Sequence, residues 1–223
     1  MPLTRSAALT TDQSRAAWTA IILTGGAGTR IGREKSSVML GDFTLVEHVL
    51  MGLPSRVEVI VVGPDLPRPP RPVTCTRESP QGGGPVAGLA AGLHLVTTEI
   101  VGVIATDMPF AGGLLESLAQ SIPPGADALM PVDTTGHRQP LCAAYRVTAL
   151  RSALCALGAL TGTSMRTLLT HLVVAETTST TLDAPFDKLD AQFDKEVLFD
   201  IDTPSDLDRS RAIMLERKGR SHG

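Results

Sequence analysis

Apolar residues recur along the chain in two patterns, continuous runs and helical spacing, which alternate over the first 130 residues. The runs 18–23 (WTAIIL), 57–63 (VEVIVVG) and 100–107 (IVGVIATD) are typical of strands buried on both faces of a sheet. Between and after them, apolar residues spaced by three or four positions predict three helices, marked by Leu45, Val46, Val49, Leu50 and Leu53, by Val86, Leu89, Ala90 and Leu93, and by Leu114, Leu115 and Leu118. This alternation predicts a mostly parallel sheet between two helical layers.

The second half of the chain continues with shorter elements. We expect strands within 127–132 (DALMPV) and 138–147 (RQPLCAAYRV), extended pieces at 172–178 (LVVAETT) and 197–203 (VLFDIDT), and helices at 148–157, 164–172 and 205–215. Thr203 or Ser205 is suited to cap the last helix. We therefore expect one domain over residues 18–215, preceded by a flexible leader (1–17) and followed by a polar tail (216–223).

Length and composition narrow the class of protein. The 223 residues suffice for one sizeable α/β domain with its own core. A net charge of −3 and an aromatic content of 3% disfavour nucleic acid as a partner, and no apolar run approaches the length of a membrane span. Three widely spaced cysteines, Cys75, Cys142 and Cys155, predict reduced core thiols in a cytoplasmic protein and give no zinc signature.

Candidate chemistry lies in the loops that follow two predicted strands, TGGAGTRIGREK (24–35) and TDMP (106–109). In parallel sheets, ligands bind beyond the carboxyl ends of the strands. Glycines let backbone N–H groups approach an anion, while Arg30 and Lys35 can neutralise phosphates. The loop does not match the phosphate loop GxxxxGK[ST], because no glycine pair is followed by Lys in that register. It does not match the dinucleotide fingerprint GxGxxG either, because Ile31 stands where the third glycine belongs. A plain connecting turn with solvated cations is the alternative interpretation.

The segment LTGGAGTRIGREK (23–35) resembles the LAGGxxxRMGxDK signature of the molybdenum cofactor guanylyltransferases, members of the nucleotidyltransferase superfamily. GGGPVAGLAAGL, ATDMPF and DIDTPSDL follow in the family's order, and the similarity runs from about Ala20 to Leu207. Thr24, Ile31 and Glu34 replace the usual Ala, Met and Asp, which leaves the base and the acceptor open. The resemblance implies a three-layer α/β/α Rossmann-like nucleotidyltransferase fold with a mostly parallel central sheet.

The resemblance also implies an activity, the Mg²⁺-dependent transfer of GMP from GTP to the terminal phosphate of molybdopterin, with release of pyrophosphate. In the family, the first loop wraps the nucleotide. Carried over to this chain, Leu23, Thr24 and Gly25 would meet the guanine and ribose, Gly26, Gly28 and Thr29 would cradle the phosphates, and Arg30 and Lys35 would be their counter-charges. Glu78 is the acid nearest to the position where the family contacts the nucleotide, one residue off the strict register.

Asp107 is the main candidate for a metal ligand. It follows a buried strand, so its carboxylate is expected at the carboxyl edge of the sheet, and Pro109 stops the strand from continuing. Mg²⁺ is typically held by one or two carboxylates plus substrate phosphates. The resemblance makes Asp202 the second metal ligand, and Asp200, two residues away on an extended stretch, would share its face. Acids that favour a helix N-terminus are the alternative interpretation of this pair.

The residues that would bind the acceptor substrate are less well defined by the sequence. The resemblance puts His137, Arg138, Gln139 and Arg166 there, where cations could bind the molybdopterin phosphate or pterin. Alternatives are an enzyme that uses CTP or a sugar or polyol phosphate acceptor, and a non-catalytic nucleotide-binding protein of the same fold. The expected partners are GTP and molybdopterin, with room for transient contact with other molybdenum-cofactor proteins and none expected with nucleic acid or membrane.

Overall fold

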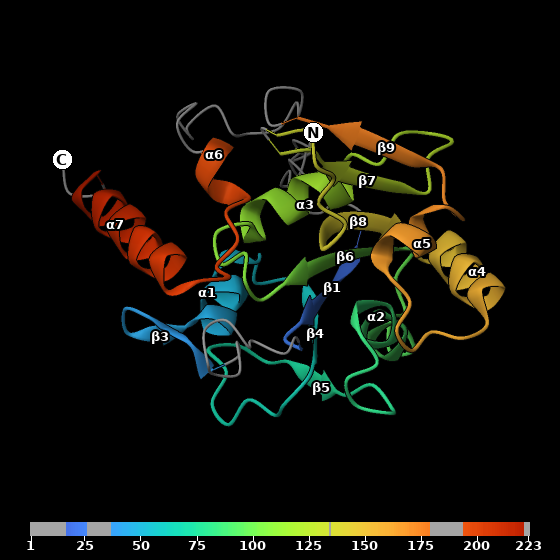
Figure 1. The fold of residues 1–223 in the computed structure, drawn as a ribbon, viewed down its shortest axis with the longest axis horizontal. Helices are drawn as coiled ribbons and strands as arrows, with labels where there is room; N and C mark the ends of the chain where they lie inside the picture. Colours follow the sequence, from blue (N-terminus) through green and yellow to red (C-terminus); the bar gives the residue numbers. More distant parts are fainter. Residues whose placement is uncertain (1–16, 26–36, 134, 179–193, 221–223) are drawn as a thin grey trace, which may run out of the picture.

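The computed structural model describes residues 17–25, 37–133, 135–178 and 194–220, which form three layers around a central sheet (Figure 1). The described residues give a seven-stranded sheet in the order β5-β4-β1-β6-β8-β7-β9. In chain order these strands are β1 (Trp18–Leu23), β4 (Glu58–Val62), β5 (Thr74–Thr76), β6 (Ile100–Ala105), β7 (Ala128–Pro131), β8 (Cys142–Arg146) and β9 (Val174–Thr177). The predicted mostly parallel sheet is confirmed.

Strand β1 lies at the centre of the parallel part of the sheet. It pairs in parallel with β4 and β6, so that Leu23 stands opposite both Val62 and Ala105. Strand β8 is the exception, because it runs antiparallel to both β6 and β7. The segment that enters β8 therefore lies at the same edge of the sheet as the carboxyl ends of β1 and β6.

Helices cover both faces of the sheet (Figure 1). On one face, α1 (Leu45–Gly52) and α3 (Gly112–Gln120) pack on inward side chains such as Ile22 of β1. On the other, α2 (Pro85–Leu93), α4 (Val147–Leu157) and α5 (Met165–Leu169) pack on side chains such as Ile21. Both faces are covered, which explains why the central strands read as continuous apolar runs. Each such side chain, fully buried, contributes about 1.5–3 kcal/mol to the free energy of folding.

The remaining elements flank the α1 and α3 face. A hairpin of β2 (Met39–Leu40) and β3 (Phe43–Thr44) packs with Ile201 and α7 (Pro204–Arg220) in a small cluster, and α7 then extends away from the sheet (Figure 1). The expected extended piece at 197–203 is wrong at its start, because Val197 ends the short helix α6 (Asp194–Val197) and a turn follows at Leu198; residues 199–203 join no described strand. The N–H of Ile201 donates instead to the carbonyl of Asp107, at 3.0 Å.

The cap predicted from the sequence for the last helix is present. Thr203 accepts a hydrogen bond from the N–H of Asp206 at 3.2 Å, while the Asp206 carboxylate accepts one from the N–H of Thr203 at 2.8 Å. This reciprocal pair confirms Thr203 as the cap of α7. Pro85 occupies the start of α2, where its missing N–H costs nothing.

The cysteines differ from the prediction. All three are free; Cys142 is buried and Cys75 partly buried, but Cys155 is exposed on α4, so the expectation of a core thiol is wrong there. Cys155 follows the buried Leu154, and one residue along a helix turns the side chain by about 100°. Within the described ranges, no helix combines the length and the apolar character needed to cross a membrane.

Helices α1 and α3 approach each other backbone to backbone. A Cβ on Gly112 would lie 2.6 Å from the carbonyl carbon of Gly52, whereas one on the neighbouring Gly113 would meet nothing within 4 Å. We expect Gly112→Ala to force the two helices apart and to lower the free energy of unfolding by about 1–3 kcal/mol, as overpacked cores do. Urea denaturation followed by circular dichroism measures this change.

The control is Gly113→Ala, one residue away in the same helix turn. It should leave stability unchanged or raise it slightly, because alanine is the better helix former. Equal urea midpoints for the two variants would contradict the backbone contact between α1 and α3.

Candidate active site

The site begins where β1 and β6 end side by side. Thr106, 2% exposed, donates hydrogen bonds from both its N–H and its hydroxyl to the carbonyl of Leu23, each at 3.1 Å. Because of these bonds, the loop that follows Leu23 and the residue that follows Thr106, which is Asp107, leave the sheet next to each other. The Leu23 side chain itself lies in the core against α2.

Thr24 fixes the start of the glycine loop to the next strand. Its N–H and its hydroxyl both donate to the carbonyl of Val62 at 3.0 Å, and its side chain is buried. A Cβ on Gly63 would lie 1.8 Å from the Thr24 hydroxyl oxygen, so this position excludes every other residue type. Both hydrogen-bond donors of Thr24, its hydroxyl and its N–H, are therefore committed to the sheet.

Glu78 lies beside the described beginning of the loop. Its Oε1 accepts a hydrogen bond from the N–H of Gly82 at 3.1 Å, which closes the turn before α2. The same oxygen is 4.0 Å from the point where Gly25 would carry a Cβ. The predicted nucleotide contacts Gly25 and Glu78 thus come together above the ends of β1 and β5.

A pocket of about 510 Å³ opens beyond the carboxyl end of β6. Two carboxylates line it, Asp107 and Asp200, whereas the predicted metal ligand Asp202 does not. The remaining lining residues come from the end of β6, the start of α2, the segment before β8 and the start of α5: Ala105, Met108, Gly84, Pro85, Gln139, Pro140, Leu141, Gly162, Thr163, Ser164 and Met165.

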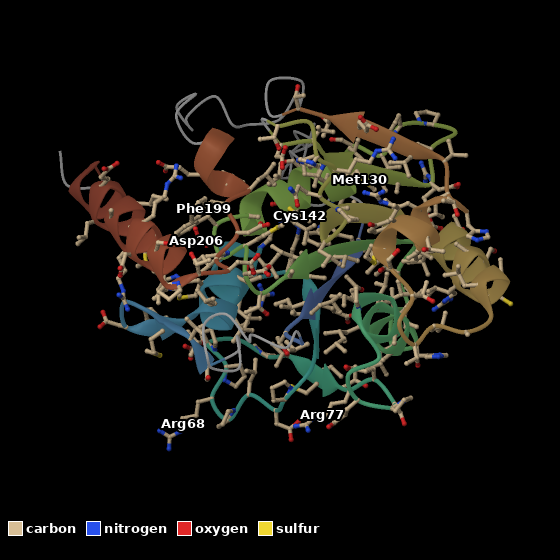
Figure 2. All side chains as sticks on the ribbon, in the orientation of Figure 1. Arg68, Arg77, Met130, Cys142, Phe199 and Asp206 are labelled. Atoms are coloured by element: carbon tan, nitrogen blue, oxygen red, sulfur yellow. The ribbon has the colours of Figure 1, made fainter. Side chains whose placement is uncertain are left out.

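The segment that contains Asp200 leads into the cap of α7. The carboxylate of Asp206 accepts hydrogen bonds from the N–H groups of Asp202, at 3.2 Å, and Thr203, at 2.8 Å. Its hydrogen bond from the Thr203 hydroxyl, followed by those backbone bonds, lowers the pKa of Asp206 below its usual value, so it is ionised at neutral pH. Figure 2 shows Asp206 at the start of α7, close to Phe199.

Cys142, at the start of β8, is a buried thiol and lies in the middle of the molecule in Figure 2. Burial, and then the charge of Asp200, raise the pKa of Cys142 to about 12. A thiol with such a pKa stays protonated at neutral pH, so Cys142 is not a nucleophile. This effect of Asp200 on Cys142 agrees with a position of the Asp200 carboxylate near the start of β8.

The opposite wall is built from the connection between β7 and β8 and from the turn before α5. The N–H of Gly162 donates to the carbonyl of Gly83 at 2.8 Å, which ties that turn to the start of α2. On the far side of Pro140 a second pocket, of about 580 Å³, has a cationic lining. Its residues are Gly136, His137, Arg138, Pro140, Arg166, Leu169 and Thr170.

The predicted site residues are therefore placed as follows. Leu23, Thr24, Gly25, Glu78 and Asp107 gather at one edge of the sheet, and their roles toward a ligand stay predictions. The loop residues predicted to hold phosphates lie outside the described residues: Gly26, Gly28, Thr29, Arg30 and Lys35.

Two pocket residues gained weight only from the structure. Asp200, which the sequence ranked behind Asp202, lines the pocket, and so does Gln139. No local pattern ranked Asp200 above Asp202, because the capping pair Thr203 and Asp206 predicts only where the last helix begins. For Gln139 the signals were its position directly before a predicted strand and the resemblance, which puts it on the acceptor side.

A family model described as the MobA-like NTP transferase domain matches residues 20–177. The described part of this match contains the ends of β1 and β6, Glu78, Asp107 and the β7–β8 connection. Asp200 and α7 follow it in the chain.

Individual relatives match a shorter part of the chain than the family model does. Proteins named probable molybdenum cofactor guanylyltransferase from Mycobacterium bovis and Mycobacterium tuberculosis are 33% identical over 135 residues, which is 56% of this chain. The match covers 66% of their length, just under two thirds.

Solved structures reproduce the fold over nearly the whole chain. Molybdopterin-guanine dinucleotide biosynthesis protein A from Archaeoglobus fulgidus is 26% identical with a TM-score of 0.67, over 89% of this chain and 99% of that one. A 2-C-methyl-D-erythritol 4-phosphate cytidylyltransferase from Thermus thermophilus shares the fold alone, at 20% identity and a TM-score of 0.59 over 87% and 97%. The family model matches most of the length of the chain, and the order of the sheet and the position of the pocket at the carboxyl ends of the strands agree with it. The chain belongs to the MobA-like NTP transferase domain family.

Proposed function

We propose that the protein transfers GMP from GTP to the terminal phosphate of molybdopterin and releases pyrophosphate. The observation that carries the proposal is the shared exit of Asp107 and the glycine loop from neighbouring strand ends, beside a pocket with a second carboxylate. The names of the mycobacterial relatives and of the Archaeoglobus structure support the choice of nucleotide and acceptor.

The donor set suits Mg²⁺. Asp107 and Asp200 line one pocket and are joined through the bond from the Ile201 N–H to the Asp107 carbonyl. Among the residues that the structure describes, no group of three or more His, Cys, Asp or Glu side chains could hold a metal. Two carboxylates completed by substrate phosphates and water are the usual environment of Mg²⁺. Bound there, the ion would offset negative charge on the phosphates and orient them.

The chain's own residues then act mainly by positioning and charge neutralisation. A terminal phosphate oxygen of molybdopterin forms a bond to the α-phosphorus of GTP, and the bond from that phosphorus to the bridging oxygen of the β-phosphate breaks. Pyrophosphate leaves with the bonding electrons and its added charge. Arg30 and Lys35 are assigned to that charge, and Gly26, Gly28 and Thr29 to the backbone cradle. No side-chain nucleophile is needed.

The cationic pocket beyond Pro140 supports an anionic acceptor. Arg138 already forms an ion pair with Glu176, whereas Arg166 and His137 line the same pocket from α5 and from the β7–β8 connection. An acceptor whose phosphate reaches Asp107 has its remaining body directed along the wall that contains Gln139 and Pro140. Sugar and polyol phosphates, or CTP as donor, are alternatives that one experiment separates.

The direct test incubates the full chain with Mg²⁺, GTP and molybdopterin and measures the dinucleotide and pyrophosphate. We expect both products with GTP and little of either with CTP or with sugar phosphates. Melting curves give an independent readout, since a nucleotide at 100 times its Kd should stabilise the fold by about 2.7 kcal/mol. Pyrophosphate release only with CTP or a polyol phosphate would replace the proposed substrates, and no release with any pair would favour a non-catalytic nucleotide-binding protein.

Asp107→Asn keeps the size of the side chain but removes its charge. We expect kcat to fall by about 10²–10³-fold or more, as when a preorganised electrostatic group is lost, while the melting temperature stays within a few degrees. Pyrophosphate release under single-turnover conditions measures the rate. A variant that keeps nearly the wild-type rate would remove Asp107 from the metal site.

The same substitution, Asp to Asn, distinguishes the roles of Asp200 and Asp202 in metal binding. Because Asp200 lines the pocket and Asp202 does not, Asp200→Asn should weaken Mn²⁺ binding, measured by electron paramagnetic resonance in the presence of GTP, by about tenfold. Asp202→Asn is the matched control and should bind Mn²⁺ nearly as the wild type does. The reverse order of the two variants would restore the ligand set predicted from the sequence.

A further inference from the structure

Gln139 is a pocket residue whose side chain and backbone are both held by hydrogen bonds. It lines the pocket that contains Asp107 and Asp200, on the wall formed by the connection between β7 and β8. The inference drawn from it concerns the choice of acceptor, and it rests on the proposed function.

The backbone around Gln139 is fixed on every side. Its N–H donates to the carbonyl of Pro131 at 3.0 Å, and its carbonyl accepts from the N–H of Cys142 at 3.0 Å. The next carbonyl, that of Pro140, accepts the hydroxyl of Tyr145 at 2.6 Å. Tyr145 is fully buried in β8, so this part of the wall is anchored to the core of the sheet.

The side chain of Gln139 is held by Asp133. Its Nε2 donates to Asp133 Oδ2 at 3.1 Å. The other carboxylate oxygen, Oδ1, accepts from the N–H of Thr135 at 2.8 Å, from the Thr135 hydroxyl at 2.6 Å and from the N–H of His137 at 2.9 Å. Asp133 thus organises the turn of the hairpin and the Gln139 amide at once.

The charge of Asp133 decides which way the amide faces. The hydrogen bond from the Thr135 hydroxyl, followed by that from the His137 N–H, lowers the pKa of Asp133 to about 2. The carboxylate is therefore ionised at neutral pH and can only accept hydrogen bonds. An amide turned the other way would place its oxygen against this carboxylate. The NH₂ group of Gln139 must therefore face Asp133, and the amide oxygen of Gln139 must point away from it.

We propose that Gln139 is a specificity-determining residue for the acceptor and that Asp133 is its positioning residue. The oriented amide oxygen accepts a hydrogen bond from an N–H or O–H group on the body of the acceptor, next to the reacting phosphate. Acceptors that carry an anionic or purely acceptor oxygen at that place leave the Gln139 oxygen unpaired and are rejected. A site built around a hydrogen bond discriminates far more strongly than an apolar one.

The test uses steady-state kinetics of the full chain with Mg²⁺, GTP and molybdopterin. Gln139→Met keeps the length of the side chain without the amide, and Asp133→Asn lets the amide reverse. Each is expected to raise KM for molybdopterin by about tenfold, the effect of about 1.4 kcal/mol lost, while KM for GTP and the melting temperature change little. A general loosening of the fold would not produce this split.

The double variant adds a second readout. If Asp133 acts through Gln139, Asp133→Asn in the Gln139→Met background should raise KM for molybdopterin no further. The matched control is Asp127→Asn, just before β7, where the carboxylate accepts a hydrogen bond from the N–H of Val173 at 2.8 Å, away from the pocket. This control should leave both KM values at the wild-type level.

The outcomes are distinguishable. A selective rise in KM for molybdopterin with a non-additive double variant supports the role of Gln139. An active wild type whose Gln139→Met and Asp133→Asn variants keep the wild-type KM for molybdopterin, or raise both KM values equally, overturns the inference alone. A wild-type chain that makes no guanylylated product overturns the proposed function, and the assignment of Gln139 with it.

Discussion

The double hydrogen bond from Thr106 to the Leu23 carbonyl is the constraint on which the site depends. It joins the carboxyl ends of β6 and β1 in the buried centre of the sheet, where an unpaired polar group would cost about 1–3 kcal/mol. Because both strands are covered on both faces, neither end can shift without exposing apolar side chains. The glycine loop and Asp107 consequently start from one rigid point, although they are about 80 residues apart in the chain.

The two carboxylates of the pocket reach it by different routes. Asp107 is positioned by a buried strand, whereas Asp200 precedes the cap of α7, which Asp206 organises outside the pocket. A backbone bond from the Ile201 N–H to the Asp107 carbonyl links the two segments. The fully buried Ile201 side chain, packed with the β2–β3 hairpin, fixes that bond. The C-terminal helix thereby belongs to the architecture of the site and not only to its periphery.

The sequence predicted those features that depend on local pattern. Continuous apolar runs, without alternation of polar residues, identified β1, β4 and β6. The strand that ends before Asp107 placed this residue at the edge of the sheet. The choice between Asp200 and Asp202 was beyond local reasoning, because it depends on tertiary contacts of this segment such as the bond from the Ile201 N–H to the Asp107 carbonyl. The orientation of Gln139 was equally hidden, since it depends on Asp133 and on Tyr145 across the hairpin. Lys35 and its neighbours lie outside the described residues.

Because β8 is antiparallel to its neighbours, two kinds of connection meet at the edge of the sheet where the pocket lies. The glycine loop belongs to a crossover between parallel strands, whose path and handedness leave little freedom. The β7–β8 connection is a hairpin, and hairpin loops accept insertions and exchanges without any change in strand order. Natural or laboratory evolution can therefore graft a different hairpin onto this scaffold to recruit another acceptor, while the machinery for the donor nucleotide is inherited unchanged.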